Sequence, residues 1–203
     1  MLAAIVTAAG ASVRMGGHPK ALLDWHGDTF LGGILKACFA AGIERRVVAL
    51  GHDADRIRAQ VPLDGITVVE SADLAAGPIG SVRAGLATLM RHPVDGVLIW
   101  PVDRPHVQVS TIEALLAAFD RRTHAVIVPM YDGHRGHPVV FARSVFGEIM
   151  AAPDREGARA VVRRDPSRVL AVAVDDRAVI EDVNTPDEYR NLLRRGDQLR
   201  LFR

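Results

Sequence analysis

The loop after the first apolar run of the chain carries residue types that suit a phosphate-binding site. Residues 7–20 combine small amino acids with two cationic side chains, Arg14 and Lys20. Small residues allow backbone N–H groups to approach a ligand closely, and such groups form concave anion sites. The stretch is not a Walker A loop, because Lys20 is neither preceded by Gly nor followed by Ser or Thr. A plain Gly/Ala turn with surface cations is the alternative, and the complete spacing directly after a strand favours a cradle for a triphosphate.

A carboxylate stands at the end of another apolar run. Residues 96–100 predict a strand, and Asp103 follows it closely. Mg²⁺ in proteins is usually held by one or two carboxylates together with substrate phosphates and water. The alternative role for Asp103 is to begin a turn before Pro105. With a phosphate-binding loop in the same chain, the metal interpretation is favoured.

Both groups need a scaffold that brings remote loops together. Apolar runs alternate with segments of helical periodicity, which is typical of a mostly parallel sheet covered by helices on both faces. We therefore expect a single-domain, three-layer α/β/α sandwich of the Rossmann-like class, with ligands outside the carboxyl ends of the strands. Ser110 and Thr185 are expected to cap two of the helices. The expected strands are 2–7, 46–50, 66–70, 96–100, 125–129, 138–141 and 169–174, and the expected helices are 29–41, 54–60, 81–90, 110–119, 157–163 and 186–193.

Length, charge and cysteine content narrow the classes of function. The 203 residues suit one domain, and a net charge of +1 gives no reason to expect a nucleic-acid partner. Cys38 is the only cysteine, so an internal disulfide is excluded, and its place on a helically spaced apolar stripe predicts core packing. The N-terminal stretch is unlike a signal peptide, and no apolar run is long enough to span a bilayer. We expect a cytoplasmic protein without a membrane partner.

The first loop resembles the signature loop of the NTP-transferase family. Its sequence AAGASVRMGGHPK over residues 8–20 follows the pattern AAGxSxRMGxxxK. The family includes molybdenum-cofactor cytidylyl- and guanylyltransferases and sugar-phosphate nucleotidyltransferases, and its motifs run from Ala8 to Tyr189 here. The resemblance implies the Rossmann-like nucleotidyltransferase fold, with Arg14 and Lys20 contacting the phosphates of an NTP. The other loop positions that it assigns to nucleotide binding are Ala8, Ala9, Gly10 and Ser12.

The same resemblance extends to the metal site. The family carries an Asp followed two residues later by Pro, as Asp103 and Pro105 do, although Val102 and Arg104 replace the Gly and Gln common in cytidylyltransferases. The segment EDVNTP over 181–186 resembles a late family segment in which Asn184 completes the metal site; Asp182 is the less favoured candidate. Helix capping is the alternative role for this segment.

Two further regions resemble substrate-contacting parts of the family. In residues 71–81 the resemblance assigns Asp73, Gly77, Gly80 and Ser81 to the nucleotide; a loop with a helix cap is the alternative. In residues 131–141 and 154–159 it assigns Arg135, His137 and Arg159 to the acceptor. Zinc is not expected at His134 and His137, because neither a Cys nor a third His stands at ligand spacing.

The resemblance implies a Mg²⁺-dependent nucleotidyltransferase with Lys20, Arg14 and Asp103 as catalytic residues. Residues 1–105 would mainly bind the NTP and 106–203 mainly the acceptor. The closest match is transfer of CMP from CTP to the phosphate of molybdopterin: AAG and RGHP resemble the cytidylyl branch, while GPIG and NTP resemble the guanylyl branch. Guanylyl transfer, a sugar- or alcohol-phosphate acceptor, and a non-catalytic nucleotide- or cofactor-binding regulator or chaperone are the alternatives. A transient contact with a molybdoenzyme or its chaperone is also expected.

Overall fold

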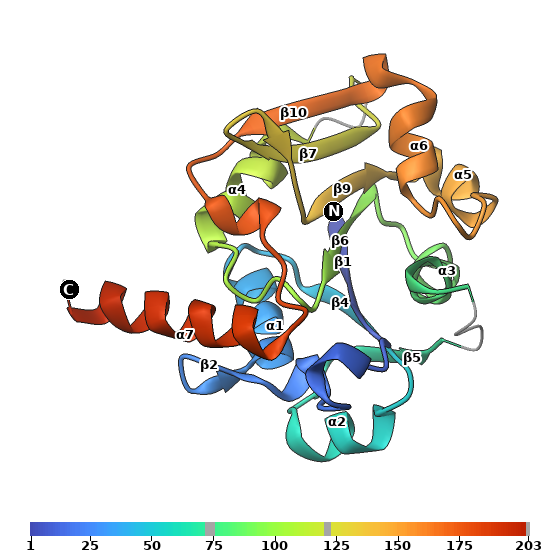
Figure 1. Ribbon diagram of the computed structural model, residues 1–203. Coiled ribbons are helices and arrows are strands. Elements are labelled where there is room, and N and C mark those ends of the chain that lie inside the picture. The colour runs from blue at the N-terminus through green and yellow to red at the C-terminus, as the bar shows by residue number, and fades with distance from the viewer. Residues whose placement is uncertain (72–75, 120–122, 202–203) are drawn as a thin grey trace.

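A mixed, mostly parallel sheet forms the central layer of the molecule (Figure 1). The computed structural model describes residues 1–71, 76–119 and 123–201. The strand order is β10-β7-β9-β6-β1-β4-β5, and β8 pairs with β7 outside this path. Only β8 and β9 among the described strands of this sheet run antiparallel to their neighbours. The strands are β1 (Leu2–Ala8), β4 (Arg45–Leu50), β5 (Thr67–Glu70), β6 (Gly96–Pro101), β7 (Val126–Tyr131), β8 (His134–Arg135), β9 (Val139–Ala142) and β10 (Val169–Ala173).

The two faces of the sheet carry separate apolar cores. Successive side chains of a strand point to opposite faces, so Ala4 and Val6 of β1 join one core while Ala3 and Ile5 join the other. Strands buried on both faces explain the continuous apolar runs in the sequence.

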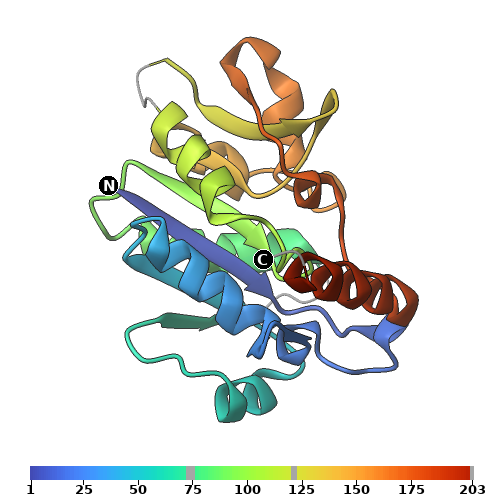
Figure 2. The same ribbon diagram turned by 90° about the vertical axis from the view of Figure 1, so that its left-hand side faces the viewer.

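Helices cover both faces and complete the three layers. The first face is covered by α1 (Phe30–Ala40) and α4 (Val109–Ala118), and the second by α3 (Pro78–Leu89), α5 (Phe146–Met150) and α6 (Arg159–Arg164). Figure 2 views the molecule from the side of α1 and α4, with α7 (Pro186–Leu201) alongside. The short α2 (Ala54–Gln60) contributes Ile57 to the first core. The predicted single-domain α/β/α sandwich is therefore confirmed.

Several local predictions need adjustment. The prediction that Ser110 caps α4 is wrong: the cap is Gln108, because the buried Asp176 carboxylate accepts hydrogen bonds from Gln108 N (2.8 Å) and Thr111 Oγ1 (2.7 Å). The helix expected from residue 81 begins at Pro78. The cap at Thr185 is confirmed, since its Oγ1 accepts from the backbone N–H of Glu188 at 3.3 Å.

A small ribbon between the first loop and α1 was not predicted. It consists of β2 (Asp24–Trp25) and β3 (Asp28–Thr29), joined by His26 and Gly27 with φ of 59° and 80°. Two positive φ angles in a two-residue loop are typical of a tight β-hairpin turn.

Two sequence expectations about burial and membranes can be compared with the structure. Cys38 is fully buried in the first core, as predicted, and burial raises the pKa of its thiol to about 12. Across residues 1–71, 76–119 and 123–201, every helix is too short or too polar to traverse a lipid bilayer.

Candidate functional site

Three distant parts of the chain meet beyond the carboxyl ends of the central strands. Parallel pairing of β1 with β6 brings the loop after β1 next to the loop after β6. As a result, Lys20 Nζ lies 3.5 Å from Asp103 Oδ2. The same Nζ donates a hydrogen bond of 2.6 Å to Asn184 Oδ1, from the segment just before α7. The structure therefore brings together the cation, the carboxylate and the amide that the sequence singled out.

Hydrogen bonds within the first loop set its conformation. Ser12 has a positive φ of 50°, its carbonyl accepts from Met15 N at 2.8 Å, and its Oγ accepts from Lys20 N at 3.2 Å. Met15 anchors the loop in the first core, whereas Gly10 and Arg14 stay exposed. Arg14 and the glycines of the loop therefore face outward, whereas the Lys20 side chain turns inward and is 14% exposed.

A second cation reaches Asn184. Arg14 Nη2 donates to Asn184 Oδ1 at 3.0 Å, and the Asn184 Nδ2 donates to Asp182 Oδ2 at 2.6 Å. The backbone N–H of Asn184 is held by the Glu188 carboxylate at 2.7 Å. The amide is thus fixed from both sides, with its oxygen turned toward the two cations of the first loop.

The Asp103 carboxyl lies in a mixed electrostatic environment. Burial raises its pKa, the positive charges of Lys20 and Arg104 oppose that shift, and the Asp182 charge adds to it. Its backbone carbonyl accepts from Val183 N at 2.9 Å, which ties the loop after β6 to the segment bearing Asp182 and Asn184. A partly buried carboxylate that already attracts cations is suited to a divalent ion.

The oxygens of Asp103, Asp182 and Asn184 fit the preference of Mg²⁺ for hard oxygen ligands. A cation, the Lys20 ammonium, already contacts the Asp103 and Asn184 oxygens. No three His, Cys, Asp or Glu side chains form a possible metal-binding group within the described residues. Mg²⁺ can be held by one or two carboxylates when substrate phosphates supply further oxygens, so the donor set fits a metal that shares its ligands with a nucleotide.

The predicted acceptor residues are only partly brought together. Burial lowers the pKa of His137 to about 4, and the nearby charges of Arg104 and Arg159 lower it further, against Asp182. His137 is therefore neutral at pH 7 and faces two cations. Arg135 is exposed in β8, where it pairs with Met130. Its role stays a prediction.

Arg104 organises this side of the site, which sequence reasoning did not foresee. Its Nη1 donates to the carbonyls of Val179 (2.8 Å) and Glu181 (3.0 Å). The Val179 carbonyl also accepts from His137 N at 2.8 Å. The departure from the family pattern at residue 104 was the signal in the sequence, but its partners lie 75 and 77 residues away in the chain.

The predicted nucleotide segment after β5 opens α3. Gly77 precedes the helix with φ 67°, and its carbonyl accepts from Gly80 N at 3.1 Å. Ser81 is buried inside the first turns of the helix. Asp73 lies outside the described residues. The glycine at 77 is required by its backbone conformation, and contact with a base stays a prediction for this segment.

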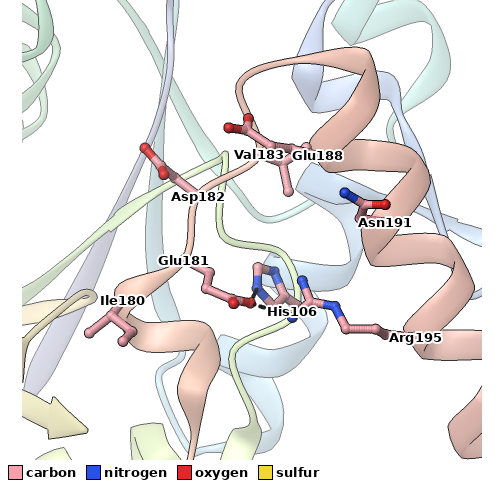
Figure 3. Close-up of a pocket in the computed structure, with 8 residues that line it drawn as sticks. All are labelled: His106, Ile180, Glu181, Asp182, Val183, Glu188, Asn191 and Arg195. Atoms are coloured by element: carbon pink, nitrogen blue, oxygen red, sulfur yellow. Dashed lines mark hydrogen bonds and ion pairs between the residues drawn. The ribbon is translucent and has the colours of Figure 1, made fainter. Parts of the chain in front are cut away.

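A pocket of about 420 Å³ adjoins the site (Figure 3). It lies between α7, the loop after β6 and residues 180–183, and Asp182 lines it. Glu181 accepts from Arg195 Nη1 at 2.8 Å and lies 3.8 Å from His106 Nε2. Burial lowers the pKa of His106 to about 4, and its two ring nitrogens have no hydrogen-bond partner among the described residues. Sequence reasoning missed this group, because its members are far apart in the chain.

Comparison with known proteins gives matches over nearly the whole chain. Residues 4–169 match the MobA-like NTP transferase domain. Nicotine blue oxidoreductase from Paenarthrobacter nicotinovorans is 29% identical over 93% of this chain and 95% of that protein. Molybdenum cofactor cytidylyltransferase from Escherichia coli K12 is 24% identical over 91% and 92%, respectively. A protein named "Probable molybdenum cofactor guanylyltransferase" from Bacillus cereus Q1 is 30% identical over 92% and 93%.

Solved structures give the same fold. A nucleotidyl transferase from Methanothermobacter thermautotrophicus has a TM-score of 0.80 at 20% identity, covering 98% of this chain and 99% of that one. Rv0371c from Mycobacterium tuberculosis H37Rv, in complex with manganese, has a TM-score of 0.77 at 32% identity, covering 95% and 97%. The prediction of a nucleotidyltransferase fold is therefore confirmed.

Proposed function

Given that this chain belongs to the family of MobA-like NTP transferase domains, we propose that it transfers CMP from CTP to the phosphate of molybdopterin and releases pyrophosphate. The observation that carries the proposal is the meeting of Lys20 with Asp103 and Asn184 at the carboxyl ends of the central strands. A lysine beside a carboxylate and an amide oxygen can bind a triphosphate and a divalent ion together.

The chain's own residues act mainly by positioning and charge neutralisation, as phosphoryl chemistry requires. Arg14 and Lys20 bind the phosphates and stabilise charge that develops on the reacting and leaving groups. The acceptor phosphate has its second pKa at about 6, so its attacking oxygen is largely ionised at neutral pH and needs no general base. Asp103, with Asn184 and Asp182, would hold Mg²⁺, which when bound polarises the α-phosphate.

The charges around His137 support binding of a phosphorylated acceptor. His137 lies near Arg104 and Arg159 and is neutral at pH 7, so it can donate a hydrogen bond without adding charge. Two arginines beside a neutral imidazole suit a phosphorylated acceptor. Delivery of the product to a molybdoenzyme or its chaperone belongs to the same proposal.

The choice of CTP rests on short motifs. Residues 8–10 and 135–138 favour CTP, and residues 77–80 and 184–186 favour GTP. The relatives named for molybdenum cofactor chemistry include both a cytidylyl- and a guanylyltransferase. CTP remains our choice, and guanylyl transfer to the same acceptor is the alternative.

The decisive experiment measures pyrophosphate release with CTP and with GTP, each with molybdopterin and with sugar phosphates as acceptors. We expect release with CTP and molybdopterin in the presence of Mg²⁺.

Two variants test the residues of the site. Lys20→Ala should lower turnover by about 10²–10³, as loss of one preorganised donor does at other anion sites, and Asp103→Asn should abolish the metal-dependent activity. Unchanged turnover in either variant would remove that residue from the chemistry.

One relative supports a second candidate function. Nicotine blue oxidoreductase is named for a redox activity and matches this chain over nearly its full length. The same preparation should therefore be tested for a redox change of nicotine blue, followed by its absorbance. Such a change without pyrophosphate release with any NTP would replace the transferase proposal.

A further inference from the structure

We propose that the Lys20 ammonium occupies the cation position of the free protein, and that binding of a triphosphate draws it away. The divalent ion would then enter with the nucleotide and not before it. The inference rests on the proposed function, because it takes Asp103 and Asn184 as metal ligands. It adds a binding order to that function.

One ammonium contacts both proposed ligands. Lys20 Nζ lies 2.6 Å from Asn184 Oδ1 and 3.5 Å from Asp103 Oδ2. A Mg²⁺ ion binds oxygens at about 2.0–2.1 Å, so an ion held by either oxygen would compete with the ammonium for the same partner. The Lys20 side chain is 14% exposed and that of Asp103 25%. Water therefore only weakly screens the repulsion between the Lys20 ammonium and a divalent ion bound beside it.

The Asn184 amide and the backbone of Asp103 are already held in place. Asn184 is held through its Nδ2 by Asp182 at 2.6 Å and through its backbone N–H by Glu188 at 2.7 Å. Asp103 is held through its carbonyl by Val183 N at 2.9 Å. Only the two cationic side chains at these oxygens, those of Lys20 and Arg14, need to move for the oxygens to become available.

Lys20 can move its charge without leaving the loop. Its backbone N–H stays bonded to Ser12 Oγ at 3.2 Å, while its four-carbon side chain can turn toward a bound phosphate. Arg14, which donates to the same Asn184 oxygen at 3.0 Å, is exposed and can turn to the phosphates as well. A triphosphate thus offers both cations stronger partners than a neutral amide.

Two consequences follow for binding. The free protein should bind a divalent ion weakly, and the nucleotide should strengthen that binding. By reciprocity, the ion should strengthen nucleotide binding by the same factor.

The test measures Mn²⁺ binding to the protein with and without α,β-methylene-CTP. The concentration of free Mn²⁺ is read from its electron paramagnetic resonance signal. The Mn²⁺ complex of the analogue alone is titrated separately. We expect Lys20→Met to bind Mn²⁺ about tenfold or more tightly than the wild type without nucleotide. The gain on adding the analogue should be large for the wild type and much smaller for Lys20→Met. Lys36→Met is the matched control, because Lys36 pairs with Asp28 and its side chain is 80% exposed.

Two results would overturn the inference. One is Lys20→Met binding Mn²⁺ no more tightly than the wild type, with circular dichroism showing a folded variant. The other needs no variant: wild-type protein binding Mn²⁺ equally well with and without the analogue. Neither readout needs an acceptor or turnover. Intact coupling without pyrophosphate release would overturn the proposed function alone.

Discussion

Substitution of Gly136 by alanine tests the packing that joins the two halves of the site. A Cβ at this position would lie 2.1 Å from the Val179 carbonyl oxygen and 2.5 Å from its carbon. Backbone atoms cannot give way as a flexible side chain can. The same oxygen accepts from His137 N and from Arg104 Nη1, both at 2.8 Å. The added methyl group must therefore push the segments around Gly136 and Val179 apart and break these hydrogen bonds.

The expected cost can be worked out from those contacts. Forcing an extra carbon into a filled position costs about 1–3 kcal/mol. A neutral hydrogen bond contributes about 0.5–1.5 kcal/mol, and one from a charged group about 1.5–3 kcal/mol. We expect Gly136→Ala to lower the free energy of unfolding by roughly 3–7 kcal/mol, a large part of the ~5–15 kcal/mol typical of a domain.

Urea denaturation of the variant measures this loss. Gly147→Ala in α5 is the matched control, because a Cβ there meets no atom within 4 Å. In a helix this exchange should gain about 0.5–1 kcal/mol. Because Val179 belongs to the segment leading to Asp182 and Asn184, Gly136→Ala should also weaken Mn²⁺ binding. A Gly136→Ala protein within about 0.5 kcal/mol of the wild type would refute the packing argument.

Three further outcomes follow from the structure. His106 and His137 each have a pKa lowered from 6.5 to about 4, chiefly by burial, so between those pH values the unfolded chain binds protons that the folded chain does not. Above about pH 6.5 these histidines do not change the free energy of unfolding, and as the pH falls to about 4 each lowers it by up to about 3 kcal/mol. Urea unfolding at pH 7.5 and 4.5 measures this loss. The Cys38 thiol, fully buried and with its pKa raised to about 12, should react slowly with a thiol reagent at pH 8 and rapidly in urea. Thr185→Val should cost about 1 kcal/mol, because it removes the acceptor for Glu188 N at the start of α7.

Each of these outcomes has a clear opposite. Equal stability at pH 7.5 and 4.5 would contradict the burial of the two histidines as neutral groups. Fast labelling of Cys38 in the folded protein would contradict its core position. Thr185→Ser keeps the hydroxyl and should lose less stability than Thr185→Val, and an equal loss in the two variants would contradict the capping role of that hydroxyl.

The layers and the central meeting of Lys20 with Asp103 could be predicted from the sequence. Apolar runs mark buried parallel strands, and loops after such strands share one edge of a sheet. The family pattern over residues 8–20 then predicts which side chains of the loop bind the phosphates. Asn184 was reached only through the resemblance, since its local sequence is equally typical of a helix start.

Other features depend on contacts that no local pattern encodes. Ser110 looked like the better cap for α4, but Asp176, 68 residues from Gln108, sets the start of the helix. The two-residue strands of the β2–β3 ribbon are too short to show alternation. The role of Arg104 depends on backbone carbonyls, and any residue type could supply those.

The order in which the chain is synthesised bears on when this site can exist. Arg14 and Lys20 emerge from the ribosome long before Asn184, whose amide oxygen both contact and which lies 170 and 164 residues further along the chain. Domains can begin to fold during synthesis, so the strands from β1 to β6 can assemble while the loop cations still lack that partner. A nascent chain therefore gains its complete arrangement of charges only after the segment that carries Asn184 has been synthesised.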